Sequence, residues 1–90
     1  MTFREDKVPD FLEIFRNSRE RIRSMDGCLH LELMKDPEHE NILTTYSRWE
    51  SEIALNAYRN SALFGDVWPA TKALFKEKPV AFSLLESGPV

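Results

Sequence analysis

Apolar residues near the start of the chain follow a helical period. Between residues 8 and 25 they recur three or four positions apart, which is typical of an amphipathic helix. These residues are Val8, Phe11, Leu12, Phe15, Ile22 and Met25. The pattern predicts a helix over residues 7–24. Asp6 is its expected N-cap, Pro9 fits the first turn, and Gly27 can supply a left-handed stop.

From residue 28 onward the period changes to two. Leu29, Leu31 and Leu33 alternate with Cys28, His30, Glu32 and Met34. A second extended run covers residues 42–49, and the polar loop over residues 36–41 contains a proline. Alternation on both sides of a polar loop predicts a β-hairpin whose loop is exposed.

Two helices and a last strand are expected after the hairpin. Ser51 can cap a helix that runs to about residue 60. Asp66 and Pro69 repeat the spacing of Asp6 and Pro9, which predicts another helix over residues 66–76. Its inward-facing residues are expected to be Val67, Trp68, Thr71, Leu74 and Phe75. In the final segment Val80, Phe82 and Leu84 alternate with Ala81, Ser83 and Leu85, as in a strand over residues 80–85.

The elements follow the order β-α-β-β-α-α-β. This order predicts one α+β domain over residues 1–90, ferredoxin-like, with an antiparallel sheet that carries helices on one face. The predicted strands carry apolar residues on both faces, and such a patch is poorly tolerated by a monomer. We therefore expect a homodimer in which two sheets pair.

Composition and charge exclude several classes of protein. The chain has 15 acidic and 12 basic residues, a formal charge of -3 and no basic block, so nucleic acid is not an expected partner. The longest uncharged runs, residues 41–47 and 79–85, are far shorter than a membrane span, so no membrane is expected. The single cysteine, Cys28, allows no internal disulfide and fits a reducing compartment. We expect a cytoplasmic protein.

A segment after the hairpin carries a family resemblance. Residues 46–52 (YSRWESE) read as a strand that ends on Trp49, and Tyr58, Ser61 and Phe64 follow on the helical path. This order resembles the antibiotic biosynthesis monooxygenase (ABM) family, small proteins of the dimeric ferredoxin-like α+β barrel type. The resemblance implies a dimer whose two sheets close into a barrel with the helices outside. Family members open with a longer strand than residues 1–4, so we expect the first strand to be incomplete at the N-terminus.

The resemblance also implies a chemistry, that of a cofactor-independent monooxygenase. In this chemistry a small electron-rich substrate, such as a quinol, polyphenol or enol, is deprotonated and its anion reacts with dioxygen. The protein must supply a base, polar groups that hold the anion, and a dry pocket. The three glycines are too widely spaced for a phosphate-binding loop, so no flavin or nicotinamide cofactor is expected.

Seven residues are candidates for the site. His30 is the candidate base because imidazole changes charge near neutral pH. Tyr46 or Tyr58 is the candidate anion partner. The candidate pocket walls are Trp49, Phe64, Trp68 and Phe75. For each of these residues the alternative to a functional role is a purely structural one, as a packed side chain. Tyr46 is expected on the strand face opposite Trp49.

The sequence also fits functions other than oxygenation. The chain can instead be a dimeric small-molecule binding or metabolite-modifying protein without oxygenase activity, or a structural dimer. A haem-degrading branch of the same fold requires a His on the last helix, where this chain has Trp68, so haem is not expected. Cys28, His30 and Glu32 are expected on one strand face, but neighbours on one strand rarely complete a tetrahedral site, so no metal is expected.

Overall fold

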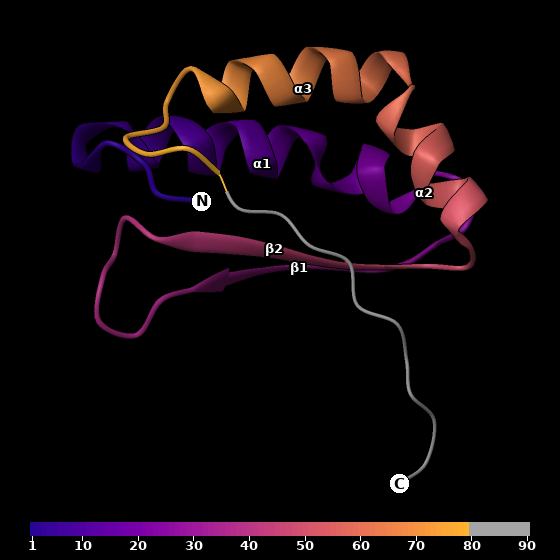
Figure 1. Cartoon of the computed structure of the whole chain (residues 1–90), viewed down its shortest axis with the longest axis horizontal. Coiled ribbons are helices and arrows are strands. Elements are labelled where there is room, and N and C mark those ends of the chain that lie inside the picture. Colours follow the sequence, from indigo (N-terminus) through magenta and orange to yellow (C-terminus); the bar gives the residue numbers. More distant parts are fainter. Residues whose placement is uncertain (80–90) are drawn as a thin grey trace, which may run out of the picture.

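The chain forms a β-hairpin with helices packed on one side. The computed structural model describes residues 1–79, and the strand predicted over residues 80–85 lies outside this range. The elements are a 3₁₀ turn η1 (Glu5–Lys7), α1 (Val8–Arg23), β1 (Cys28–Lys35), β2 (Leu43–Trp49), α2 (Glu52–Arg59) and α3 (Ala62–Lys72). Both α1 and α3 run along the hairpin, and α2 lies at the end where β1 begins and β2 ends (Figure 1). The predicted α+β class is confirmed.

The start of α1 differs in detail from the prediction. Pro9 lies in the first turn as expected. Asp6 is not the N-cap: it lies inside η1, which begins one turn earlier, where the N–H of Lys7 donates to the backbone oxygen of Arg4 at 2.9 Å. No side chain caps η1 or α1. Asp6 is instead an acidic residue in the first turn of η1, where its negative charge interacts favourably with the helix dipole.

Gly27 adopts the left-handed conformation that its position suggested. Its φ is +82°, and the N–H of Cys28 donates to the backbone oxygen of Met25 at 3.0 Å across the turn. Gly27 was expected to end the first helix, but α1 already ends at Arg23. The turn at Gly27 instead directs the chain into β1. The backbone oxygen of Gly27 then accepts from the N–H of Glu50 at 2.7 Å.

A β-bulge at the start of β1 changes which residues share a face. The strands are antiparallel, with Cys28 opposite Trp49 and His30 opposite Arg48, so Leu29 is the extra residue. Cys28 is therefore buried at 6% exposure, while Leu29 is 51% exposed. The expectation that Cys28 shares a face with His30 is wrong, because one inserted residue reverses the alternation.

The third predicted helix begins earlier than expected. It was expected over residues 66–76, but α3 starts at Ala62, and the Ser61 hydroxyl caps it by accepting from the N–H of Phe64 at 3.2 Å. Pro69 thus lies inside the helix. Proline has no N–H to donate to the carbonyl four residues earlier, at Gly65, and the ladder resumes with the N–H of Ala73 donating to the backbone oxygen of Pro69 at 3.2 Å.

The helix before it was predicted correctly. Ser51 has an extended backbone and its hydroxyl accepts from the N–H of Ala54 at 3.1 Å, which makes it the N-cap of α2. The helix ends at Arg59, one residue before the expected end.

The core is centred on the extended segment before α1. Phe3 is fully buried and stacks on Phe11 with ring centroids 4.3 Å apart. Phe3 also pairs with Phe75, while its neighbour Thr2 pairs with Ile42. The N-terminal residues therefore join the loop end of the hairpin to the segment that follows α3.

Candidate functional site

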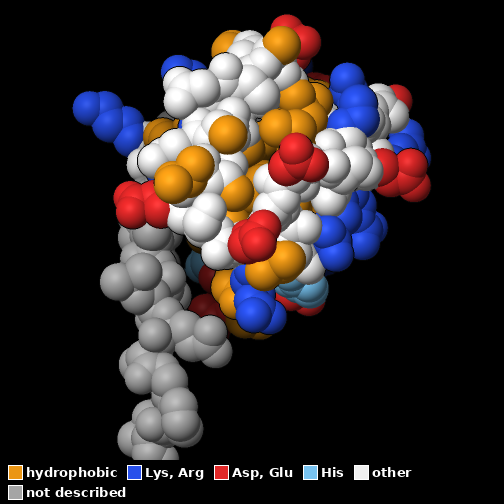
Figure 2. All heavy atoms as spheres, turned by 90° about the vertical axis from the view of Figure 1, so that its right-hand side faces the viewer, with side chains coloured by type: hydrophobic (Ala, Val, Ile, Leu, Met, Phe, Trp, Pro, Cys, Tyr) orange, Lys and Arg blue, Asp and Glu red, His pale blue; other side chains and the backbone are white. Residues whose placement is uncertain are grey.

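Five of the seven candidate residues form one continuous row of aromatic rings, here called the aromatic row. It runs through Trp49, Tyr58, Phe64, Trp68 and Phe75. Trp49 stacks on Tyr58 with centroids 5.1 Å apart, and each later step spans 5.2 to 5.9 Å. All five side chains are partly exposed. The face of the molecule on the α2 side shows hydrophobic side chains at the surface between charged ones (Figure 2).

Local sequence features place these rings. Trp49 ends β2, and the Ser51 cap starts α2 at once, so Tyr58 in its last turn comes back over the indole. Phe64 and Trp68 are four residues apart on α3 and hence on one face of that helix. The row thus depends on two helix caps and the end of one strand.

Trp49 is held by its own strand. Its indole Nε1 donates to the Ser47 hydroxyl at 3.0 Å, two residues earlier on the same face. At the far end of the row, the Lys72 ammonium lies 6.0 Å from the centre of the Trp68 ring, within the range of a cation–π contact.

Tyr58 carries the hydroxyl group of the row. Burial of its hydroxyl raises its pKa above the usual value near 10, and the neighbouring Cys28 thiol, when ionised, raises the pKa further. The phenol is therefore protonated at neutral pH and can donate a hydrogen bond. Cys28 reaches this side only because of the bulge, so sequence reasoning did not connect the two residues.

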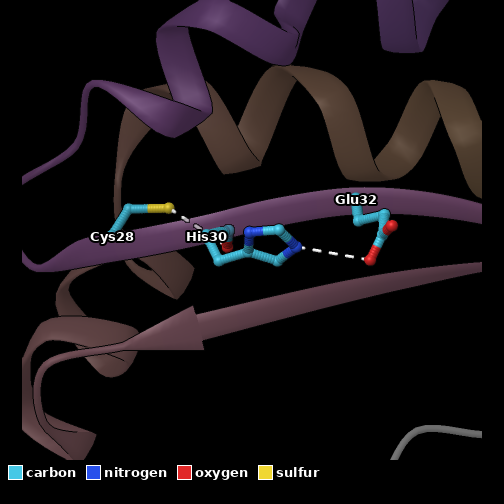
Figure 3. Close-up of polar contacts among 3 residues, drawn as sticks. All are labelled: Cys28, His30 and Glu32. Atoms are coloured by element: carbon cyan, nitrogen blue, oxygen red, sulfur yellow. Dashed lines mark hydrogen bonds and ion pairs between the residues drawn. The ribbon is translucent and has the colours of Figure 1, made fainter.

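His30 and Tyr46 lie on the other side of the hairpin, away from the aromatic row. The register pairs Glu32 with Tyr46 and His30 with Arg48, and these four residues are here called the outer-face cluster. The prediction that Tyr46 faces away from Trp49 is confirmed. In Figure 3 the His30 ring points along the strand to Glu32, where Nε2 lies 3.3 Å from Oε2. The ring also meets Tyr46 edge-on, with centroids 5.8 Å apart.

The structure therefore separates the candidate base from the candidate walls. Within residues 1–79 the Cys28 thiol donates to the backbone oxygen of His30, at 3.7 Å, and its side chain does not join the imidazole (Figure 3). The pairing of Glu32 with His30 has one signal in the sequence, their two-residue spacing on a strand, which places both side chains on one face. Within residues 1–79 no three His, Cys, Asp or Glu side chains are grouped to hold a metal ion.

Two surface hollows lie apart from the aromatic row. One, of about 360 Å³, lies between α1 and the hairpin, and the other, of about 620 Å³, lies between the end of α1 and the start of α3. The first is lined by Val8, Leu12, Leu33, Lys35, Glu40 and Leu43. None of the helices in the described residues is long and apolar enough to cross a membrane.

The match to known proteins agrees with this arrangement. The family described as antibiotic biosynthesis monooxygenase (ABM) matches residues 1–68. The chain belongs to this family. The match includes the end of β2, all of α2 and most of the aromatic row, so four of its five rings lie within the ABM region. No match to the chain is found among curated proteins.

Solved structures share the ABM fold. A conserved protein from Methanosarcina mazei Go1 is 21% identical with a TM-score of 0.82, and the match covers 86% of this chain and 76% of that one. Rv0793 from Mycobacterium tuberculosis is 22% identical with a TM-score of 0.82, covering 98% and 91%. A structure described as an antibiotic biosynthesis monooxygenase is 18% identical with a TM-score of 0.80, covering 86% and 81%. At such identities the likeness shows the ferredoxin-like fold alone.

Proposed function

We propose that this ABM protein is a cofactor-independent monooxygenase for a small electron-rich substrate of the quinol, polyphenol or enol class. The observation that carries the proposal is the partly exposed aromatic row with a protonated tyrosine, Tyr58, within it. Aromatic faces bind a planar substrate by offset stacking. Family membership supports the class of reaction.

Tyr58 would act as the anion partner. Its hydroxyl, kept protonated by burial, donates a hydrogen bond to the phenolate or enolate oxygen of the substrate. The substrate anion then delivers electrons to dioxygen, and a C–O bond forms at a ring carbon. Loss of water from the resulting hydroperoxide leaves a carbonyl there. One oxygen atom enters the product, the other leaves as water, and the substrate supplies all the electrons.

The proton of the substrate leaves to water in this proposal. The row is partly exposed, and His30 lies on the opposite side of the hairpin within one protomer. The predicted base role of His30 therefore requires a substrate at the outer face. His30→Ala tests that role, and we expect its turnover to stay near that of the unmodified protein.

We also propose a homodimer formed through the outer face of the hairpin. Leu29, Met34 and Tyr46 are 51%, 44% and 41% exposed, so large apolar side chains of the two strands are in water. A second copy can cover them through an isologous contact, in which one patch meets its own equivalent. Sedimentation should give a dimer at micromolar concentration, and a stable monomer would contradict the proposal.

Oxygen uptake with a panel of quinols and polyphenols tests the activity. Tyr58→Phe should lower kcat about 10²-fold, since removal of one oxyanion donor has an effect of this size. Tyr46→Phe is the matched control, because it removes the other tyrosine hydroxyl of the chain and lies on the outer face. Equal losses in the two variants would contradict the assignment of Tyr58.

The alternative is a small-molecule binding protein of the same fold that performs no oxygenation. The observation in its favour is that the candidate base, His30, lies on the other side of the hairpin from the partly exposed aromatic row. A ligand that quenches the fluorescence of Trp49 or Trp68 with no oxygen uptake would support this alternative.

A further inference from the structure

Lys72 lies beside one end of the aromatic row, and the proposed oxygenase site assigns it no role. We infer that Lys72 is a specificity-determining residue: its ammonium binds an acidic substituent of the small molecule that lies on the row. The inference rests on the proposed function, because it concerns the substrate of the same site. It narrows the substrate from any quinol, polyphenol or enol to one that also carries a carboxylate.

Helical spacing brings the Lys72 ammonium to the rings. Phe64, Trp68 and Lys72 are each four residues apart on α3, so they share one face of this helix. The planes of the Phe64 and Trp68 rings are 17° apart and their centroids 5.9 Å apart, and the ammonium lies 6.0 Å from the centre of Trp68. Tyr58 meets the other ring, Phe64, at 5.2 Å. A molecule that covers both rings therefore has the Tyr58 phenol at one end and the Lys72 ammonium at the other.

The Lys72 ammonium has no carboxylate partner in the part of the chain that the structure describes. The ion pairs of residues 1–79 lie on η1, α1 and β1 and do not include Lys72. Its side chain is exposed, and its contact is the face of the Trp68 indole. This contact restricts a long side chain in advance, so less rotamer entropy is lost when the ammonium binds an anion.

Arg4 offsets the charge of the helix end beside Lys72. The last carbonyls of a helix carry a partial negative charge, which would oppose the binding of an anion. The Arg4 guanidinium donates from Nη2 to the backbone oxygen of Ala73 at 2.8 Å, and the Arg4 N–H donates to the backbone oxygen of Leu74 at 3.1 Å. The carbonyls next to Lys72 therefore have partners of their own, and the charge of Lys72 is left for a ligand.

These contacts favour an acidic aromatic molecule over a neutral one. The flat part of the molecule stacks on Phe64 and Trp68, and its carboxylate pairs with the ammonium. A neutral molecule of the same shape keeps the stacking and loses the ion pair. Lys72 lies beyond the matched ABM region, residues 1–68, so its role is inferred from its contacts in this chain.

Calorimetric titration without oxygen tests the inference with two matched probes. One is a dihydroxynaphthoate whose carboxylate lies on the ring without hydroxyls, and the other is the neutral carboxamide of the same compound. The unmodified protein should bind the acid about three- to fivefold more tightly than the amide, as expected for an exposed ion pair. Lys72→Gln should remove this preference, and Lys72→Arg should keep it. Added salt should reduce it, because exposed charges are screened.

Lys7→Gln is the matched control, because it removes the same charge from a lysine that already faces Asp10 at 3.7 Å. This variant should keep the preference for the acid. An unchanged preference in Lys72→Gln would overturn the inference, as would equal binding of acid and amide by the unmodified protein, or no binding of the acid. Oxygen uptake with the same two probes reports separately on the proposed function: a preference for the acid without uptake would support the role of Lys72 and contradict the oxygenase.

Discussion

Gly27 packs against Ala54 so closely that a Cβ added at Gly27 would lie 2.5 Å from the Cβ of Ala54. The backbone of the turn before β1 thus packs directly against the Ala54 side chain in the first turn of α2. The same glycine has a φ of +82°. Two separate constraints, conformation and space, therefore require glycine at this position.

Gly27→Ala should destabilise the protein by about 2–4 kcal/mol, because a left-handed non-glycine residue and a steric clash both add cost. Denaturant unfolding measures this difference. Gly65→Ala is the control: it lies in α3, nothing would contact its new Cβ within 4 Å, and alanine favours the helix. A similar loss in both variants would contradict this account.

The start of α3 can be tested with a pair of substitutions. Ser61→Ala removes the hydroxyl that accepts from the N–H of Phe64 and should cost about 1 kcal/mol. Asp66→Ala changes the residue that the sequence pattern suggested as the cap, and it should alter stability by no more than about 0.5 kcal/mol. Thermal unfolding of both variants would distinguish the two starting points, and the reverse order would favour a helix that begins at Asp66.

The raised pKa of Tyr58 predicts a loss of stability at alkaline pH. A folded-state pKa above the unfolded one means that the folded protein holds its proton longer. The stabilisation is complete below about pH 10 and is lost as pH rises through the raised folded value. Phenolate absorbance should show a late-titrating component that disappears in Tyr58→Phe and in urea. A titration unchanged by Tyr58→Phe would argue against burial as the cause.

The hairpin loop should respond to acid through Asp36. The N–H groups of Glu38 and His39 donate to its carboxylate at 2.8 and 2.9 Å and lower its pKa. The loop order that they provide is present above the usual aspartate pKa of about 3.9 and is lost as pH falls through the lower folded value.

Amide exchange at residues 38 and 39 measures this order. Asp36→Ala should raise exchange at every pH. Asp36→Asn keeps a carbonyl acceptor, so it should stay ordered and lose the acid dependence. An acid response that survives in Asp36→Asn would point to another group.

The helical part of the fold was largely visible in the sequence because it depends on local signals. The apolar period placed α1, and the Ser51 hydroxyl marked the start of α2. At α3 two capping signals competed. The Asp66 pattern predicts a start at residue 66, but the Ser61 hydroxyl caps the helix earlier along the chain, and the helix continues through Pro69 despite the lost N–H.

The sequence predicted the residues of the candidate site but not their arrangement. Residue type and family resemblance identified the rings of the aromatic row, while the separation of His30 from Tyr58 could not be read from the sequence. It depends on the bulge at Leu29, which a period of two hides because Leu29, Leu31 and Leu33 look equally spaced. The position of an inserted residue is fixed by the partner strand, and no local pattern records it.

The placement of the first residues has a consequence for how the protein folds. The N–H of Phe3 donates to the backbone oxygen of Asn41 at 2.9 Å, and the N–H of Arg4 donates to the backbone oxygen of Leu74 at 3.1 Å. Both acceptors lie far along the chain from their donors. Contacts of such long range form slowly because loop closure precedes them. During synthesis, Phe3 therefore cannot take its place in the core until Leu74 has left the ribosome, and until then its ring is exposed to the surroundings.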